Sequence, residues 1–431
     1  MYIKNQRKTN FLSDKKASAI EFLMLACIFC GAMNFINRYF FCIYIGLIIF
    51  LIVPGRKLSV DSSFVILMLF SSAMLIFDKE SFVNFMSPLK PFIFPLCYIW
   101  GRSYVSREAT LEEHEKKLDS IIWVLAAGCG LHFLLNYLTN LNADSRNTID
   151  FWTNLVMSAT GQASIVCITL GAAVAYFFSN VPAWKKFFAI ASVIIVFLYN
   201  LILSGRTVFV LALVVCVVAY VYRLVSEKKG NLKTLFWALL VCVAVWWIFD
   251  NNVFGVQSLF EDSLLFDRFF GEQAHIDLSE DSRGKAKLFY LRHMLEWPFG
   301  GYHLHKAYDG FAHDLYFDTH DMGGIFAFMG IVIYSATTVF RLLHFIKIKE
   351  VSFNVRQVVI CVYAILHMQF WIEPIMMGMP WLLASFCLID GFVAGYIEKY
   401  ENETTTQSKL VRNKRNKKYR VIGYGYKSKN V

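Results

Sequence analysis

Residues 186–224 read KFFAIASVIIVFLYNLILSGRTVFVLALVVCVVAYVYRL, which is two long apolar runs joined by a Ser-Gly-Arg turn. A helix that crosses a bilayer needs about 20 mainly apolar residues. Each run comes close to that length, so the stretch predicts two consecutive membrane-spanning helices. The same pattern recurs along the chain and predicts about twelve spans: 17–36, 39–54, 62–77, 82–100, 120–139, 159–179, 186–203, 207–224, 234–250, 322–342, 356–372 and 379–396.

The composition of the whole chain agrees with a membrane protein. Hydrophobic residues make up 57% of the 431 residues and charged residues only 17%, whereas a soluble protein has about 25% charged residues. We therefore predict an all-α polytopic membrane protein with one long loop that contains short helices. The net charge of +10 does not indicate a nucleic-acid partner, because Lys and Arg gather at the span edges and in the two tails.

The predicted fourth span, 82–100, differs from the others because it contains Pro88, Pro91 and Pro95. Proline lacks a backbone donor and clashes with the preceding turn of a helix. Such a segment is tolerated in a membrane when neighbouring groups satisfy the freed carbonyls. We therefore expect a kinked or broken helix at this position.

The distribution of Lys and Arg predicts the orientation, because cytoplasmic loops are enriched in these residues. With the N-terminus in the cytoplasm, every strongly basic loop falls on one side, and an even number of spans keeps the basic C-terminal tail there too. The predicted division is a cytoplasmic tail 1–16, nine spans in 17–250, a large extracytoplasmic catalytic loop 251–321, three spans in 322–396, and a basic cytoplasmic tail 397–431 that we expect to be disordered.

The long loop concentrates the titratable residues of the chain. Between Asp250 and Gly324 lie six of the ten histidines, and thirteen Asp or Glu against six Lys or Arg. Polar and titratable side chains gathered between hydrophobic spans are what an enzyme at a membrane surface needs. The first candidate outside this loop is Arg206, in the turn between two outward-facing span ends. An arginine that anchors a helix end is the structural alternative, but on this face it departs from the positive-inside bias.

The segment 282–296 of the loop has a helical pattern with two faces. Leu288, Leu291 and Leu295 repeat at helical spacing and form an apolar face, while another face carries a stripe composed of Arg283, Lys287 and Tyr290. An amphipathic helix that lies on the bilayer explains this pattern without catalysis. A basic stripe within an acidic loop also suits an anionic ligand.

Two His-Asp pairs precede the next span: His313-Asp314 and His320-Asp321. A carboxylate beside an imidazole can orient the ring and stabilise its charged form. A metal site is the alternative, because further imidazoles and carboxylates lie nearby at His303, His305, Asp309 and Asp318. No recognised zinc spacing is present, so we expect no metal and no cofactor.

Three lesser candidates lie on the same predicted face. Arg146 is a loop residue for which a solvated role and a functional role are equally supported. Trp371 and Glu373 close the last outer turn, and we expect a structural role for both.

These positions together resemble a known family, the O-antigen polymerase and O-antigen ligase superfamily of bacterial envelope glycosyltransferases. The resemblance rests on the order of short motifs: Arg146 followed by Ala159-Thr160-Gly161, Ser204-Gly205-Arg206, Arg283, Pro298-Phe299-Gly300-Gly301, His313-Asp314 and Gly323-Gly324. Asp314 stands where the family usually has Asn, and His320 is a second candidate base. The topology resembles the family over nearly the whole chain, while the motifs cover about fifty residues.

The resemblance implies an inverting, metal-independent membrane glycosyltransferase of the C type. Its substrates would be an undecaprenyl-diphosphate-linked glycan donor and acceptor, joined into O-antigen, capsule or exopolysaccharide chains in the bacterial cytoplasmic (inner) membrane, with the long loop periplasmic or extracellular. A chain-length regulator and a flippase would be its protein partners. An O-antigen ligase that uses lipid A core as acceptor is one alternative, and a flippase for lipid-linked oligosaccharides, or another transporter, is a second.

The chemistry of such a transfer assigns roles to the candidates. Departure of a lipid diphosphate develops negative charge at the bilayer surface, which guanidinium groups stabilise bidentately. We expect Arg206 and Arg283 to hold the diphosphate with support from Arg146, and His313 to deprotonate the acceptor hydroxyl. His320, Asp314, Tyr290 and Lys287 are secondary candidates.

Overall fold

The computed structural model describes most of the chain. The described residues are 18–52, 58–77, 87–105, 109–143, 147–227, 243, 247, 250–253, 256–261, 266 and 282–425. Within them the secondary structure is almost entirely helical, with one pair of two-residue strands, β1 (Thr148–Ile149) and β2 (Val156–Met157), antiparallel to each other. The predicted all-α class is confirmed for this part of the chain.

Seven of the described helices are long and apolar enough to cross a membrane. They are α5 (Leu111–Thr139), α6 (Ala159–Phe178), α7 (Ala183–Leu203), α8 (Arg206–Glu227), α14 (Leu315–Phe345), α15 (Phe353–Ile372) and α17 (Pro380–Gly425). Shorter apolar helices are Ser18–Ala32, α2 (Tyr39–Ile52), α3 (Ser62–Phe77) and α4 (Ile93–Tyr104). The remaining elements are η1 (Phe35–Asn37), η3 (Ser87–Phe92), α10 (Val256–Glu261), α12 (Ser282–His293), α13 (His303–Tyr308) and α16 (Ile375–Gly378).

Three predicted segments differ from the structure or lie outside it. At 82–100 the structure has η3 followed by the short helix α4, so the proline-rich segment divides this span. The predicted span 234–250 lies almost wholly outside the described residues. The helix α17 extends to Gly425 and so reaches into the predicted C-terminal tail. The sequence has no proline after Pro380, so no residue forces this helix to stop.

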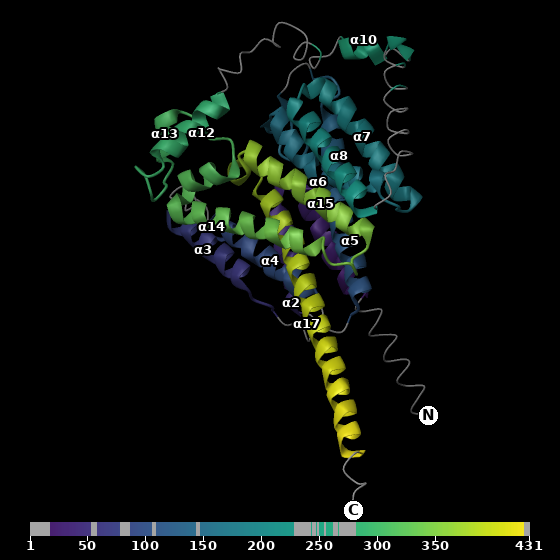
Figure 1. The fold of residues 1–431 in the computed structure, drawn as a ribbon. Helices are drawn as coiled ribbons and strands as arrows, with labels where there is room; N and C mark the ends of the chain where they lie inside the picture. Colours follow the sequence, from purple (N-terminus) through teal and green to yellow (C-terminus); the bar gives the residue numbers. More distant parts are fainter. Residues whose placement is uncertain are drawn as a thin grey trace, which may run out of the picture.

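The two ends of the helical bundle carry different segments. The helices α12 and α13 lie at one end, which we name the loop end, and α17 leaves at the other, which we name the tail end (Figure 1). The indole of Trp152 donates to the carbonyl of Met33. Lys185 forms an ion pair with Asp119. Each contact joins two segments for which we expected the same side of the membrane.

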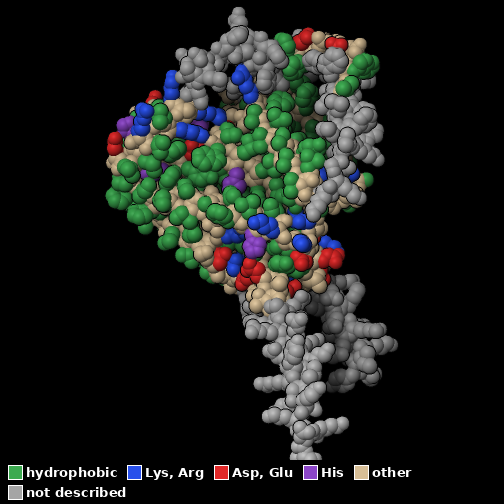
Figure 2. All heavy atoms as spheres, viewed as in Figure 1, with side chains coloured by type: hydrophobic (Ala, Val, Ile, Leu, Met, Phe, Trp, Pro, Cys, Tyr) green, Lys and Arg blue, Asp and Glu red, His purple; other side chains and the backbone are tan. Residues whose placement is uncertain are grey.

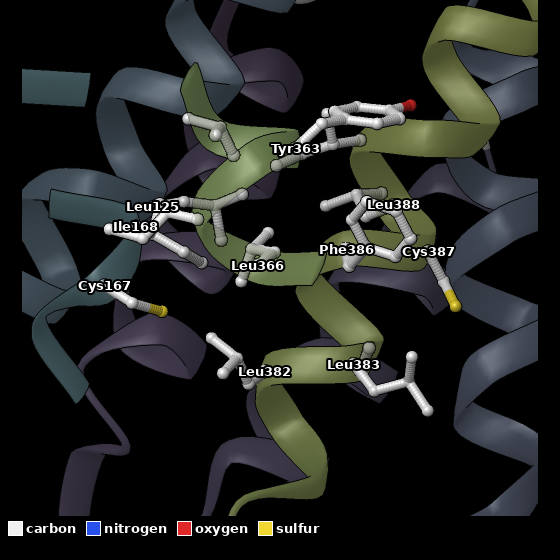
Figure 3. Close-up of a cluster of buried hydrophobic side chains, with 14 of the residues drawn as sticks. Leu125, Cys167, Ile168, Tyr363, Leu366, Leu382, Leu383, Phe386, Cys387 and Leu388 are labelled. Carbon is white, nitrogen blue, oxygen red and sulfur yellow. The ribbon is translucent and has the colours of Figure 1, made fainter. Parts of the chain in front are cut away.

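The core between the long helices is packed with large apolar side chains. Figure 3 shows Leu125 and Ile168 from one side of this core approaching Leu366, with Phe386 and Leu388 of α17 beyond it. All of these side chains are buried. The outer surface is also apolar: Figure 2 shows a broad band of hydrophobic side chains, with charged groups gathered below it and beside α12 and α13. An apolar band of this extent is expected of a protein surrounded by lipid.

Glycines bring α4 and α17 into close contact. A Cβ atom added to Gly391 would lie 2.0 Å from the carbonyl oxygen of Tyr98, and one added to Gly395 would lie 2.6 Å from that of Arg102. On the facing helix, a Cβ at Gly101 would lie 2.0 Å from the carbonyl of Leu388. The spacing Gly-x-x-x-Gly in α17 is the small-residue pattern that allows membrane helices to approach closely.

A buried ion pair ties three of the long helices together. Asp390 of α17 is fully buried and pairs with Arg341 of α14. The hydroxyls of Tyr334 and Tyr363 each donate to the same carboxylate at 2.9 Å. Because every partner is supplied by a neighbouring helix, the charge is compensated within the apolar part of the bundle.

The glycine contact makes a prediction about stability. The substitution Gly391→Ala should lower the free energy of unfolding by about 1–3 kcal/mol or more, because the added methyl group meets backbone atoms of α4. Thermal unfolding of the purified protein in detergent measures this change. Gly378→Ala is the matched control, because a Cβ there meets nothing within 4 Å. Equal unfolding temperatures for the two variants would contradict the described packing.

Candidate functional site

The helix α12 presents its two predicted faces in opposite directions. Leu288, Leu291 and Leu295 are exposed, with relative accessibilities of 46%, 56% and 76%. Arg283 and Lys287 are partly buried and Tyr290 is fully buried. The basic stripe therefore faces the protein, while the leucines face outward as in a helix that rests on a lipid surface.

Arg283 connects α12 to the end of α15. Its Nη1 donates to the carbonyl of Ile372 at 3.1 Å and lies 3.3 Å from Oε1 of Glu373. Glu373 is only 4% exposed, and its side chain also bonds to Thr160 in the first turn of α6. Burial raises the pKa of Glu373, and the positive charge of Arg283 opposes this rise. A guanidinium, a carboxylate and a hydroxyl from three elements thus meet at the loop end.

Lys287, one turn further along α12, connects α15 to α14. Its ammonium group donates to the carbonyl of Trp371 and lies 3.4 Å from Oδ2 of Asp314. Asp314 is the N-cap of α14, where its other oxygen accepts the backbone N–H groups of Tyr316 and Phe317. Burial raises the pKa of Asp314, whereas these hydrogen bonds and Lys287 lower it. Two cations therefore satisfy the last carbonyls of α15, a favourable place for positive charge.

His313 directly precedes Asp314, whose carboxylate contacts Lys287. Its backbone has a φ of 58°, in the left-handed region that is uncommon for any residue but glycine and costs about 1–3 kcal/mol. The side chain is partly buried. Burial, together with the charges of Arg283 and Lys287, lowers the pKa of His313 and so favours the neutral imidazole. A neutral imidazole with a lowered pKa can accept a proton at neutral pH.

Tyr290 and two glycine motifs hold this part of the loop in place. The hydroxyl of Tyr290 donates to the carbonyl of Gly310 at 2.9 Å, and its ring packs with Leu304 and Ala312. Gly324 has a φ of 74° and interrupts α14, where a Cβ would lie 2.5 Å from the carbonyl of Pro298. Gly300, which follows the turn at Pro298, and Gly324 of α14 thus permit a close approach of these two segments that no other residue would allow.

The predicted loop boundary at residue 321 lies within α14, close to the break at Gly324. The helix α14 begins at Leu315, so His320 and Asp321 lie in its first turns, before the break at Gly324. His320 is fully buried and packs against Phe328, which leaves its ring without access to a substrate at the surface. The carboxylate of Asp321 accepts the backbone N–H groups of Leu304 and His305. The second His-Asp pair therefore has a structural position, and His313 is the more accessible base.

The structure also places the alternative metal ligands. Asp318 accepts the backbone N–H of Ala312 at 3.0 Å, and Asp321 accepts the backbone N–H of Leu304. Within the described residues, no group of three or more His, Cys, Asp or Glu side chains is arranged to hold a metal ion.

Arg206 lies at the loop end as the first residue of α8. The preceding turn is held by Asn200, whose side chain bonds to both the N–H and the carbonyl of Gly205. A Cβ on Gly205 would lie 3.6 Å from Ala159, the neighbour of Thr160. The turn before Arg206 therefore packs on the helix end that bonds Glu373. Arg146, the third predicted phosphate ligand, lies outside the described residues.

Two further residues contribute to this part of the structure. Glu373, for which we expected a structural role, contacts Arg283, and Thr160 at the start of α6 was not predicted as a site residue. Glu373 had a usable signal, because it is an isolated carboxylate at the outer end of a span.

Comparisons with known proteins do not add a family to this description. A scan against protein-family models found none that matches the chain, and a search of curated proteins found no match either.

The site makes a prediction about titration. The pKa of His313, followed by NMR of ¹³C-labelled histidine, should lie below the ordinary value of about 6.5. Lys287→Met should raise it, because a neighbouring positive charge disfavours the protonated ring. Lys285→Met is the matched control, since Lys285 lies on the exposed side of the same helix. A pKa of His313 at or above the ordinary value, or one that Lys287→Met does not change, would contradict the described electrostatic environment.

Proposed function

We propose that this protein is a membrane glycosyltransferase that polymerises undecaprenyl-diphosphate-linked oligosaccharide repeat units. The observation that carries the proposal is that Arg283 and Lys287 lie at the loop end beside Glu373 and Asp314, and that His313 directly precedes Asp314. Two fixed cations and a neutral imidazole are the groups needed to receive a lipid diphosphate and to activate a hydroxyl. The outward leucines of α12 would keep the site at the lipid surface, where such a substrate resides.

In the proposed reaction the acceptor hydroxyl oxygen attacks the anomeric carbon of the donor glycan. The bond between this carbon and the diphosphate oxygen breaks, and its electron pair leaves with the diphosphate. His313 takes the proton of the hydroxyl. Arg283 and Lys287, with Arg206 from the neighbouring turn, stabilise the charge that develops on the leaving group, and Arg146 is a further candidate. Attack opposite to the leaving group inverts the anomeric configuration.

Glu373 and Asp314 act as positioning residues in this proposal. Each carboxylate contacts one cation of the stripe, at 3.3 Å and 3.4 Å respectively. Both are almost completely buried, so they hold the cations in place before any substrate arrives. Fixed charges need no rearrangement during the reaction, which is the main source of electrostatic catalysis.

Two other activities remain as alternatives to polymerisation. The same transfer with lipid A core as acceptor would make the protein an O-antigen ligase, and the identity of the elongated acceptor distinguishes the two. A transporter of lipid-linked oligosaccharides would use charged groups along a path but would form no glycosidic bond. The proposal favours transfer because the candidate base directly precedes Asp314, which contacts one of the cations that would receive the leaving group.

Substitutions at the site should affect product formation without affecting the amount of protein in the membrane. His313→Ala should lower polymer formation by about 10²–10⁴-fold, the usual contribution of a general base. Arg283→Lys keeps the charge but loses the bidentate fork, so we expect a loss of about 10²-fold. Gel analysis of the polymer in cells, with quantified membrane protein, measures both.

The matched control is Arg292→Lys, because Arg292 is exposed near the end of the same helix. It should leave the polymer unchanged. Wild-type chain lengths in His313→Ala would reject this histidine as the base, and equal defects in both arginine variants would reject a specific role for Arg283.

Chelation tests the metal-independent mechanism. Because guanidinium and ammonium groups would stabilise the leaving diphosphate, transfer by isolated membranes should proceed at an unchanged rate in excess EDTA. A loss of activity that added Mg²⁺ or Mn²⁺ restores would replace this mechanism with a metal-assisted one.

A further inference from the structure

The outward face of α12 is an apolar surface that the described part of the chain leaves uncovered. Leu288 and Leu291 lie on one side of the helix, and Leu295 lies in the turn that follows it. Phe299, a few residues further on, is also exposed, at 59%. Single exposed apolar side chains are common on proteins, but several on one side of a short segment mark a surface that binds a partner or a membrane.

This apolar face is continuous with the outer surface of the helical bundle. The ring of Phe299 stacks on Phe77 at the end of α3, and the two ring centroids lie 5.4 Å apart. On α3 the adjacent residue Ile76 and Leu69, two turns earlier, are each 65% exposed. Exposed apolar side chains along an apolar helix are expected where lipid surrounds it. The leucines of α12 therefore extend a surface that already faces the bilayer.

Two exposed cations flank the leucines of α12 on one edge. Lys285 and Arg292 are seven residues apart, which is nearly two full helical turns, so both lie on the same edge of the helix. Within the described residues neither of them forms an ion pair. Arg283 and Lys287, by contrast, face the protein and contact buried carboxylates. The charges of the exposed edge are therefore available to an anionic partner.

The position of these charges relative to the apolar surface suits a membrane interface. Figure 2 shows Lys and Arg side chains gathered where Figure 1 places α12, directly above hydrophobic side chains. The acidic residue nearest this edge, Glu296, lies 2.8 Å from Nδ1 of His293. Long cationic side chains at such a boundary cover apolar surface with their stems and reach the lipid headgroups with their charged ends.

We infer that α12 lies in the plane of the membrane interface and binds anionic phospholipid there. The leucines would enter the boundary of the acyl chains, and Lys285 and Arg292 would contact the lipid phosphates. Twelve residues are too few to cross a bilayer, and the contacts of Arg283 and Lys287 hold the opposite face of the helix against the protein. The inference does not depend on the proposed function.

A second copy of the chain would suit this surface less well than lipid. If two α12 helices packed antiparallel on their leucines, Lys285 of one copy would lie next to Arg292 of the other. Like charges brought together in this way oppose association. Anionic headgroups compensate the same two charges, and acyl chains cover the leucines.

Photocrosslinking to lipid tests this inference. The purified full-length protein, with p-benzoylphenylalanine in place of Leu291, is placed in nanodiscs of phosphatidylcholine with a minor fraction of phosphatidylglycerol. Mass spectrometry after illumination should detect phospholipid adducts. Phosphatidylglycerol should be enriched in them about fivefold or more over its share of the nanodisc, the effect of one basic residue near an anionic lipid surface. Salt at about 1 M, which shortens the screening length to about 3 Å, should remove this enrichment but not the adducts.

Charge variants and a reference position make the test specific. The double substitution Lys285→Glu and Arg292→Glu should abolish the enrichment and leave phosphatidylcholine adducts, whereas Arg292→Lys keeps the charge and should keep the enrichment. The same probe in place of Leu213, which is 66% exposed on α8, should give lipid adducts in proportion to the nanodisc composition.

Three results would overturn the inference. Absence of lipid adducts at Leu291 alongside normal adducts at Leu213 would show that α12 does not contact the bilayer. Crosslinks from Leu291 to a second copy of the chain would assign the surface to self-association. Lipid adducts without enrichment of phosphatidylglycerol, or an enrichment that the double substitution leaves unchanged, would contradict the binding of anionic lipid by Lys285 and Arg292.

Discussion

The contacts between α12 and the end of α15 fix the part of the molecule on which the proposed chemistry depends. Arg283 and Lys287 donate to the consecutive carbonyls of Ile372 and Trp371, and Arg283 also compensates the buried Glu373. These cations cap a helix whose last carbonyls would otherwise lack partners. These contacts alone would be sufficient for a purely structural role of Arg283 and Lys287. The proposed catalytic role depends in addition on His313, whose pKa is lowered by burial and by the charges of Arg283 and Lys287.

Much of the fold could be predicted from the sequence, because apolar runs of spanning length allow few structures other than membrane helices. The proline-rich segment before α4 was also predictable, since proline acts through its own backbone. The contact of α4 with α17 was not predicted. A Gly-x-x-x-Gly pattern permits close approach, but the sequence does not say which helix Gly391 faces. The pairing of Asp390 with Arg341 was not predicted either, because the sequence does not show which residues of neighbouring helices face each other.

The candidate site was predictable only where its residues lie close together in the sequence. Helical spacing placed Arg283, Lys287 and Tyr290 on one face of α12, and the structure turns this face toward the protein. Local patterns could not show that Glu373 would lie beneath it, since ninety residues separate the two. Partners distant in sequence are visible only once the chain has folded.

The most direct measurement is the reaction itself, with purified protein in nanodiscs and a purified undecaprenyl-diphosphate-linked repeat unit, and without any ion gradient. The account predicts longer lipid-linked glycans together with one undecaprenyl diphosphate released for each bond formed, and no such products from the His313→Ala protein. Lipid-linked repeats that remain unchanged with the folded wild-type protein would contradict a transferase and favour a transporter of the same substrate.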